Sequence, residues 1–513
     1  MVRKYYRDLV CDHEWLPAAL LLLLGCALRL ACIGVLPYGL NQDEASAGYE
    51  AYALLSSGMD RCGSTWPVLL TAWGSGQNAL MSYIDIPFVA VLGLTELAVR
   101  LPNAIAGCLT LFVFWRFARS ARGKMFGICA LFFLAVNPWH IMACRWALES
   151  NLMPLLLMTG LWRTAAARKK PQALISAAIC FALSLYAYGT MFFFLPLFLI
   201  AAIIWLRKSI RPGIFFASLL IFAVIALPIA ACQAINLLGL DKICLWGITL
   251  PKLTQSREAA TSVFGGGGLA AAGENLRTFL RLLWTQSDGL SSNSLGILRG
   301  GIFYFFGLPT AVIGFSASVL SGHREKHEGE SIMRIALLCG LICTIFINCN
   351  INRVNMLWLP LIYFSALGCF LILQKLGSWA VLPLAGVLMC FCIFFSSYCR
   401  AFSGSKSTGY FPGLGNAVRT ARAMGSRTTY ITDSVNEPYI FALFYTETSP
   451  EDFISTVKYK DNTAAFRQVD SFTGFEFDDR SRADLLILQE GEEDGCTVLA
   501  RSGNYLVCSP GGN

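Results

Sequence analysis

Two adjacent carboxylates, Asp43 and Glu44, follow the first long apolar run of the sequence directly. Charged groups at a membrane edge are costly unless they are solvated, paired or bound to a metal. A carboxylate within hydrogen-bond reach of a hydroxyl can act as a general base. The pair would also suit the positive end of a helix dipole, because an amphipathic stretch, Ala45–Ser57, comes next. The spacing alone leaves both interpretations open.

A second cluster of polar residues runs from Asn137-Pro138-Trp139-His140 to Arg145 and Glu149. His140 and Glu149 could hold a divalent cation together with Asp43. Arg145 could bind a carboxylate or a phosphate. The alternative is an ordinary polar turn with aromatic anchors at the membrane interface.

A third cluster places one arginine among four asparagines, from Asn348 to Asn355. Arg353 and Asn352 suit a lipid phosphate and sugar hydroxyls, and the alternative partner is an ordinary phospholipid headgroup. Tyr188 could stack on a sugar or belong to the interfacial aromatic belt. Arg29 lies inside the first apolar run, where it either snorkels outward or serves the site.

The elements that must position these residues are membrane helices. The chain has 513 residues, of which 56% are hydrophobic and 14% charged, whereas about 25% are charged in a typical soluble domain. Apolar runs recur, and most are near the roughly 20 residues that cross a bilayer; they include Leu16–Leu36, Ala173–Leu185, Gly213–Ala231 and Val381–Ser397. The net charge of +8 falls in short clusters between these runs, which is typical of a topology signal and not of a nucleic-acid surface.

The basic clusters predict the orientation of the chain in the membrane. All of them can lie in the cytoplasm if Ala79–Leu94, which carries Asp85 and Pro87, stays at the outer interface. About 11 spans by the length rule then put the N-terminus inside and the C-terminus outside the plasma membrane.

The composition becomes that of a soluble domain after Tyr398. We therefore divide the chain into a transmembrane catalytic part, residues 1–399, and an extracytoplasmic α/β unit, residues 400–513. The predicted elements of this unit are helices Ala417–Met424 and Pro438–Phe444 and strands Thr429–Thr432, Asp484–Gln489 and Tyr505–Cys508. Cys496 and Cys508 could form a disulfide there.

Nucleotide-binding motifs are missing from the sequence. The Gly265–Gly268 run lacks the following Lys-Ser/Thr of a phosphate loop. The conspicuous polar groups fall on the predicted outer rim, whereas a transporter usually places them near the midplane between related halves. An outward-facing sugar transferase would need a membrane-borne donor, because no nucleotide sugar is expected outside the membrane.

Three motifs resemble family 39 glycosyltransferases of the GT-C fold, a group with the protein O-mannosyltransferases and, by similarity, the lipid A aminoarabinose transferases. The motifs are Asp43-Glu44-Ala45, the block Leu94–Ala104 with its Arg-Leu-Pro, and Asn137-Pro138. The resemblance extends well over residues 15–210. It implies a polyprenyl-phosphate sugar donor, transfer on the outer face and inversion at the anomeric carbon. It also implies that Asp43 is the catalytic acidic residue, Glu44 its companion and Glu149 a second acidic residue.

The sequence thus predicts an α-helical polytopic glycosyltransferase with Asp43 as base. The predicted catalytic residues are Asp43, Glu44 and Glu149, the substrate-binding residues are Arg145, Arg353, Asn352 and Tyr188, and the ligands of a divalent metal, if one is used, are Asp43, Glu149 and His140. The expected partners are membrane lipid, the lipid-linked donor and an acceptor that is a protein, a wall polymer or a lipid glycan, with no nucleic acid and no nucleotide cofactor. The alternatives are a flippase for lipid-linked glycans and a membrane-anchored binding protein.

Overall fold

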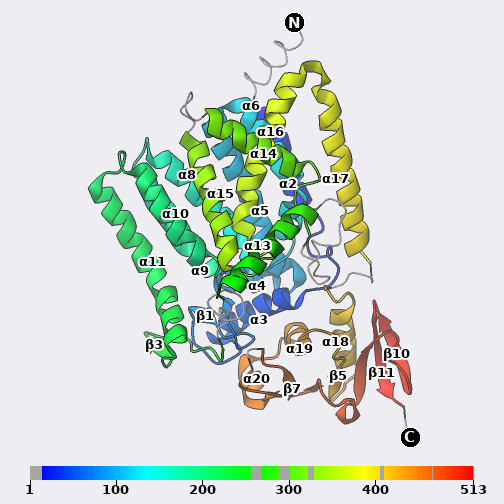
Figure 1. The fold of residues 1–513 in the computed structure, drawn as a ribbon. Helices are drawn as coiled ribbons and strands as arrows, with labels where there is room; N and C mark the ends of the chain where they lie inside the picture. Colours follow the sequence, from blue (N-terminus) through cyan, green and yellow to red (C-terminus); the bar gives the residue numbers. More distant parts are fainter. Residues whose placement is uncertain are drawn as a thin grey trace.

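A bundle of apolar helices carries a C-terminal sheet unit at one end, and the N-terminus lies at the other end (Figure 1). The computed structural model describes residues 14–255, 268–287, 301–321, 328–404, 409–464 and 466–511. The helices of the bundle are α2 (Trp15–Leu30), α5 (Glu96–Arg122), α6 (Lys124–Ala135), α8 (Met153–Ala167), α9 (Ala173–Ala187), α10 (Met191–Leu206), α11 (Pro212–Leu238), α14 (Gly307–Ser321), α15 (Glu328–Phe346), α16 (Trp358–Leu376) and α17 (Val381–Phe402).

Several of these helices are apolar enough to cross a membrane. Within the described ranges, four helical segments have both the length and the composition of a span, or five if α6 and the short α7 (Pro138–Cys144), bent by 61°, form one span. Further apolar helices, among them α2, α9, α10 and α14, are shorter. The prediction of a multi-pass membrane protein is confirmed, and the number of about 11 spans stays a prediction.

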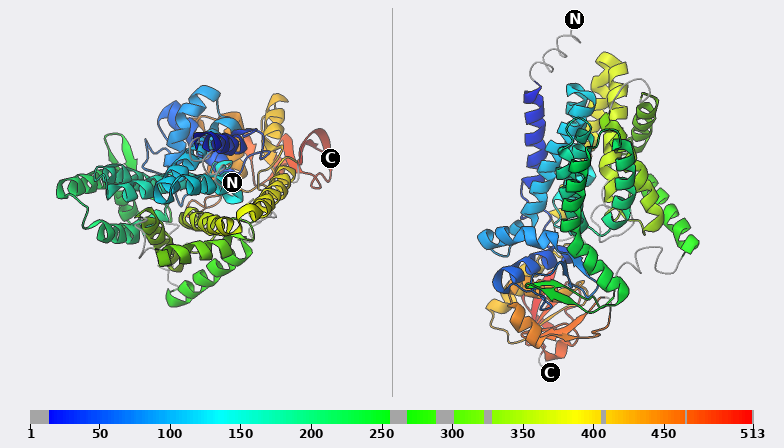
Figure 2. Two further views of the ribbon diagram at one scale, coloured as in Figure 1. Left: turned by 90° about the horizontal axis from the view of Figure 1, so that it is seen from above. Right: turned by 90° about the vertical axis from the view of Figure 1, so that its left-hand side faces the viewer.

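Two helices lie across the end of the bundle that faces the sheet unit, namely α3 (Gln42–Ser57) and α4 (Leu80–Leu92) (Figures 1 and 2). The sequence predicted that Ala79–Leu94 would not cross the membrane, and α4 covers that segment. Further elements near this end are the strands β1 (Leu69–Leu70), β2 (Gln77–Asn78), β3 (Ile243–Leu245) and β4 (Ile248–Leu250). The helical segments there are η1 (Glu149–Leu152), α13 (Gly268–Thr285) and η3 (Asn355–Leu357).

The opposite end of the bundle carries basic turns. Helix α5 ends at Arg122 and α6 begins at Lys124, at the end where the N-terminus lies (Figure 1). The turn between α10 and α11, with Arg207, Lys208 and Arg211, lies at that end as well. The two ends of the bundle therefore differ as the positive-inside rule requires of two sides of a membrane.

The C-terminal unit is a mixed sheet with helices packed on it. Its helical segments are α18 (Leu414–Ala423), α19 (Pro438–Thr446), α20 (Pro450–Thr456) and η5 (Arg480–Arg482). Its strands are β5 (Thr429–Ile431), β6 (Lys458–Tyr459), β7 (Val469–Phe472), β8 (Phe475–Glu476), β9 (Leu485–Gln489), β10 (Cys496–Ser502) and β11 (Tyr505–Pro510), in the order β10-β11-β9-β5-β8-β7-β6. Strand β5 runs parallel to both β8 and β9, and the other pairs are antiparallel.

The elements predicted for this unit are all present, at α18, α19, β5, β9 and β11. The predicted disulfide is wrong, because Cys496 and Cys508 are free. The register of β10 and β11 explains this, since Cys508 stands opposite Val498 and Cys496 stands opposite Pro510.

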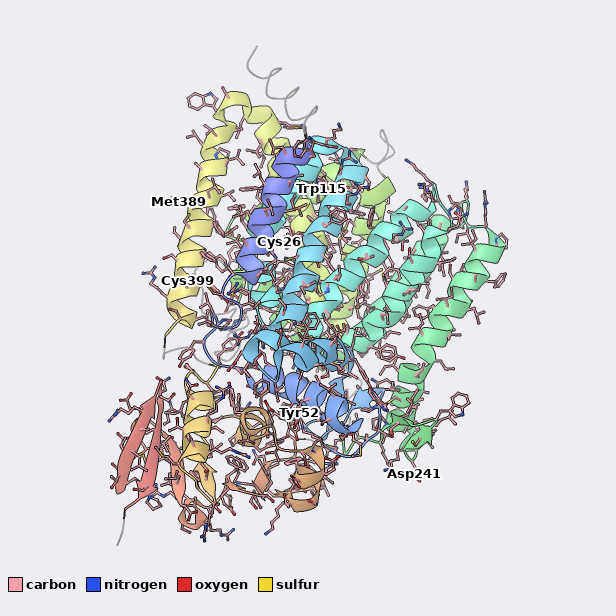
Figure 3. All side chains as sticks on the ribbon, turned by 180° about the vertical axis from the view of Figure 1, so that it is seen from behind. Cys26, Tyr52, Trp115, Asp241, Met389 and Cys399 are labelled. Carbon is pink, nitrogen blue, oxygen red and sulfur yellow. The ribbon has the colours of Figure 1, made fainter. Side chains whose placement is uncertain are left out.

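Helix α3 joins the bundle to the sheet unit. Figure 3 shows Tyr52 of α3 between the two parts, with Cys26 on α2 and with Met389 and Cys399 on α17, which stands at the edge of the bundle. The hydroxyls of Tyr49 and Tyr52 donate to the carbonyl oxygens of Thr448 and Glu447, at 2.8 and 3.0 Å. The residues of α3 from Glu44 to Ala51 are buried, whereas Gln42 and Asp43 at its start are partly exposed.

Candidate active site

A cavity of about 360 Å³ opens at the end of the bundle beside the C-terminal unit. Its lining comes from the segment between α2 and α4, the turn between α7 and α8, the α9–α10 turn with the start of α10, α11, the chain after β4 and the turn after α15. The polar and aromatic side chains that line it include Asp43, Trp73, Gln77, Asn78, Trp146, Glu149, Tyr188, Thr190, Asn352 and Arg353.

The start of α3 separates the two adjacent carboxylates. The side chain of Asn41 caps the helix by accepting from the Asp43 amide at 3.0 Å, and the Glu44 carboxylate accepts from the Asn41 amide at 3.0 Å. Neighbouring side chains on a helix point about 100° apart. Asp43 consequently lines the cavity, while Glu44 points into the protein.

Glu44 forms a buried ion pair with Arg100. Its two carboxylate oxygens accept from Nε and Nη2 of Arg100, each at 2.8 Å, and the Ala147 amide donates to it at 2.9 Å. Both side chains of the pair are fully buried. The predicted catalytic role of Glu44 is therefore corrected to a structural one, because its carboxylate is saturated with donors and does not line the cavity.

Glu149 lines the cavity and is hydrogen-bonded to Asn78, another residue of the lining. Its carboxylate oxygens accept from the backbone amide and from the side-chain amide of Asn78, at 2.6 and 3.0 Å. Glu149 belongs to η1 and Asn78 to β2, so this contact joins two segments that are 71 residues apart.

The turn after α15 brings a cation to the cavity. The Asn350 side chain accepts from the Arg353 amide at 2.7 Å, and Nη1 of Arg353 donates to the carbonyl oxygen of Asn348 at 3.3 Å. Among the residues that the structure describes, no ion pair involves Arg353, which is half-buried. An arginine without a carboxylate partner beside a cavity suits an anionic group such as a phosphate.

Two hydrogen-bonding groups of the cavity wall have no protein partner. Within the described ranges, the indole nitrogen of Trp146 and the hydroxyl of Thr190 are buried and make no hydrogen bond. Buried polar atoms are normally paired, and these two residues line the cavity. They are suited to hydroxyl groups of a bound sugar.

Comparisons with known proteins bear on the fold of the chain. Residues 79–231 match the family model described as dolichyl-phosphate-mannose-protein mannosyltransferase. The structure is similar to crystal structures of ArnT from Cupriavidus metallidurans bound to undecaprenyl phosphate (11% identity, TM-score 0.54) and in the apo state (12%, 0.53), each covering 97% of this chain and 98% of that chain. The apo oligosaccharyltransferase of Archaeoglobus fulgidus follows at 11% identity and TM-score 0.50, covering 85% of this chain and 64% of that chain. No curated protein matches the sequence.

The chain has the GT-C fold. Likeness at these identities rests on structure, and the family match begins directly before α4 and ends within α11. The resemblance noted on sequence motifs is confirmed in this way, although Asp43 and Glu44 lie before the matched segment.

Asp43, Glu149, Tyr188, Asn352 and Arg353 come together in the cavity of this GT-C chain. Arg145 does not. It is buried and donates to the carbonyl oxygens of Leu28, Arg29 and Leu36 and to the hydroxyl of Tyr398. The predicted substrate-binding role of Arg145 is corrected, because its donors hold the segment after α2.

His140 also lies away from the cavity. Its Nδ1 accepts from Nη2 of Arg29 at 2.7 Å, and Arg29 donates further to the carbonyl oxygens of Leu134 and Ala135 where α6 ends. Arg29 therefore neither snorkels nor serves the cavity. The described residues hold no group of three His, Cys, Asp or Glu side chains that could bind a metal, so the predicted ligand set of Asp43, Glu149 and His140 does not fit one.

Asn78, Trp146 and Thr190 were not predicted as cavity residues from the sequence. Asn78 follows two glycines in the left-handed region, Gly74 at φ 100° and Gly76 at φ 88°, which turn the chain into β2. That turn was visible as Trp73-Gly74-Ser75-Gly76-Gln77-Asn78, but its contact with Glu149 depends on the tertiary fold.

Proposed function

We propose that this membrane glycosyltransferase moves a sugar from a polyprenyl-phosphate donor to a hydroxyl of an acceptor on the outer face of the membrane. The observation that carries the proposal is one cavity lined by the carboxylate of Asp43 and by the cation of Arg353. The cavity is lined by residues of the apolar helices α10 and α11 and by polar residues of the segments between helices, so a lipid-linked donor and a water-soluble acceptor can both reach it. The ArnT structure with undecaprenyl phosphate supports this class of donor.

The reaction is a single displacement with inversion. The acceptor oxygen forms a bond to the anomeric carbon as the bond from that carbon to the phosphate oxygen breaks. Asp43 takes the proton of the acceptor hydroxyl. The leaving phosphate is already an anion, so it needs a cation more than a proton, and Arg353 supplies that charge.

The other cavity residues bind and orient the sugar. Glu149 holds Asn78 in place, and Trp146 and Thr190 offer donors to its hydroxyls. Tyr188 lines the cavity, and its ring stacks on the sugar in this proposal. Trp73 also lines the cavity, and the guanidinium of Arg61 lies over its ring. No step is assigned to a divalent ion, and a requirement for one stays a prediction that chelation would test.

The proposed orientation follows from the charge of the two ends of the bundle. The basic turns face the cytoplasm of a plasma membrane, and the C-terminal unit is extracytoplasmic. The acceptor is a protein, a wall polymer or another lipid glycan.

The test is transfer from radiolabelled polyprenyl-phosphate sugars in reconstituted vesicles, comparing the wild type with Asp43→Asn. Loss of a general base should slow transfer by roughly 10²- to 10⁴-fold, because Asn cannot accept the proton. The matched control is Asp452→Asn, which removes a carboxylate from the first turn of the exposed helix α20 and should leave transfer unchanged.

Two outcomes would contradict the proposal. Full transfer by a folded Asp43→Asn protein would remove Asp43 as the base. Movement of the labelled lipid between leaflets, with neither transfer to added acceptors nor donor hydrolysis, would favour a flippase.

A further inference from the structure

One short segment of the chain, residues 73–78, supplies several residues of the cavity lining, and we call it the wall segment. Its lining residues are Trp73, Ser75, Gly76, Gln77 and Asn78. The strands β1 and β2 beside it are two residues long and pair with each other. A two-stranded ribbon has little stability of its own in water. The position of the wall segment therefore depends on the parts of the protein that contact it.

The C-terminal unit contacts the wall segment through backbone and rings. The backbone amide of Arg467 donates to the carbonyl oxygen of Trp73 at 2.8 Å. Gly74 forms an antiparallel bridge with Phe466. The Trp73 ring also meets the ring of Tyr439, which belongs to α19, edge-on at 6.1 Å. Part of the cavity wall is thus held by the sheet unit.

A buried arginine lies between the same two rings. The side chain of Arg61 is 1% exposed, and its guanidinium lies 4.7 Å from the centre of the Trp73 ring and 5.7 Å from that of Tyr439. Within the described ranges, Nε and Nη2 of Arg61 are buried and make no hydrogen bond. The face of an aromatic ring attracts a cation. The two rings therefore stabilise the guanidinium on the sides where hydrogen-bond acceptors are missing.

Helix α3 holds the other side of this arginine. Arg61 forms an ion pair with Glu50 at 2.9 Å, and its Nη1 donates to the hydroxyl oxygen of Ser46 at 2.7 Å. That hydroxyl donates to Oε1 of Gln77, in the wall segment, at 2.8 Å. Asp43, Ser46 and Glu50 follow one another at helical spacing on one face of α3. Arg61 thus connects the helix of the proposed base, the wall segment and the sheet unit.

We propose that Arg61 is a positioning residue through which the C-terminal unit fixes the wall segment for binding of the donor's sugar. The inference rests on the proposed function, because it takes the sugar to bind beside Gln77 and Asn78. The donor's phosphate binds elsewhere in that function, at Arg353 on the turn after α15. Loss of the ring contacts lets the wall segment shift, which weakens binding of the sugar and leaves the phosphate contact in place.

The test is Tyr439→Leu in the full chain, because Tyr439 contacts Arg61 and lies outside the cavity lining. In vesicles with labelled polyprenyl-phosphate sugars, we expect the donor KM to rise by about 10-fold while kcat changes by less than about 2-fold. The inhibition constant of undecaprenyl phosphate, which carries no sugar, should equal that of the wild type. A merely structural loss would not separate these two constants. Tyr439→Phe keeps the ring and should have the wild-type KM.

A second set of variants tests whether Tyr439 acts through the cation. Arg61→Met combined with Glu50→Gln removes the cation and its counter-charge together, so no unpaired charge stays buried. This protein should show the raised KM. Adding Tyr439→Leu to it should change KM by less than about 2-fold, because the ring no longer has a cation to hold. If the two effects on KM multiply in full, Tyr439 acts independently of Arg61 and the proposal is wrong.

The matched control is Tyr505→Leu. Tyr505 is 4% exposed and Tyr439 3%, but Tyr505 belongs to β11, which β9 separates from the strand leading into α19. This change should lower Tm and leave both constants unchanged.

Three results would overturn the positioning role. They are a wild-type KM in Tyr439→Leu, an inhibition constant that rises together with KM, and an equal rise of KM in Tyr505→Leu. Full transfer by Asp43→Asn would instead overturn the proposed base, and the comparison of KM values would stand apart from it.

Discussion

Two neighbouring carboxylates at the start of α3 have different tasks because of where their side chains point. Asp43 lines the cavity, and Glu44 pairs with Arg100 inside the protein. Arg100 also donates to the carbonyl oxygens of Pro37 and Gly39 and lies 5.6 Å from the ring of Tyr410. The ion pair thus holds the chain segment that leads into α3. This in turn fixes the direction in which the Asp43 side chain points.

Glu44→Gln should destabilise the protein by about 3–5 kcal/mol, because it leaves a buried guanidinium without its counter-charge. Thermal unfolding in detergent, followed by loss of tertiary signal, would measure this. The matched control is Glu490→Gln, which breaks the exposed ion pair with Arg501 and should cost no more than about 1 kcal/mol. Equal losses of unfolding free energy in the two variants would mean that the buried ion pair contributes no more to stability than the exposed one.

At the scale of elements, α3 is held between α5 of the bundle and α19 of the sheet unit. Gly48 lies at the closest approach, since a Cβ there would be 2.5 Å from Cγ2 of Val99 and 2.8 Å from Cε2 of Phe444. The absent side chain lets three helices meet around the segment that carries Asp43. Because the helices are packed this closely, a displacement of α19 would also displace α3, including its first turn.

Gly48→Ala should therefore cost about 1–3 kcal/mol in the free energy of unfolding, because one added methyl group overpacks the contact. Gly273→Ala in α13 is the control, since nothing lies within 4 Å of its added Cβ. Ala is better than Gly inside a helix, so this control should gain about 0.5–1 kcal/mol. A neutral Gly48→Ala would show that α3 can move away from α19 at no cost.

For the whole molecule, the arrangement of bundle and sheet unit makes the C-terminal residues part of the catalytic end. Tyr439 packs on Arg61, Asn41 donates to the carbonyl oxygen of Gly409 at 2.9 Å, and Tyr410 covers Arg100. The proposed division after residue 399 would thus separate two parts that contact each other through Trp73 of the cavity lining and Tyr439 of the sheet unit.

Truncation after residue 399 should reduce transfer by at least about 100-fold, because Arg61 and Arg100 lose the rings of Tyr439 and Tyr410 and the segments beside the cavity are then free to shift. Transfer assays on a truncated protein that remains monodisperse and keeps its helical content would measure this. Full activity of that protein would exclude a membrane-anchored binding protein whose C-terminal unit does the work, and it would also show that these ring contacts do not position the cavity.

The sequence by itself determined the elements and the membrane character. Apolar periodicity and charge clusters are local properties, so they predicted the helices, the interfacial place of Ala79–Leu94 and the main strands around Thr429 and Leu485. The pattern Asn41-Gln42-Asp43-Glu44 made Asp43 a candidate base, which stays a prediction, and the motifs around Arg100 resembled the GT-C fold that the structure has.

Only the tertiary structure decided which polar residues meet. It joined Asp43 to Glu149 and Arg353 in one cavity. It also assigned Arg145 and His140 to structural contacts. The physical reason is that hydrogen bonds and ion pairs between residues far apart in the chain depend on how helices pack, and the spacing of residue types carries no record of that packing.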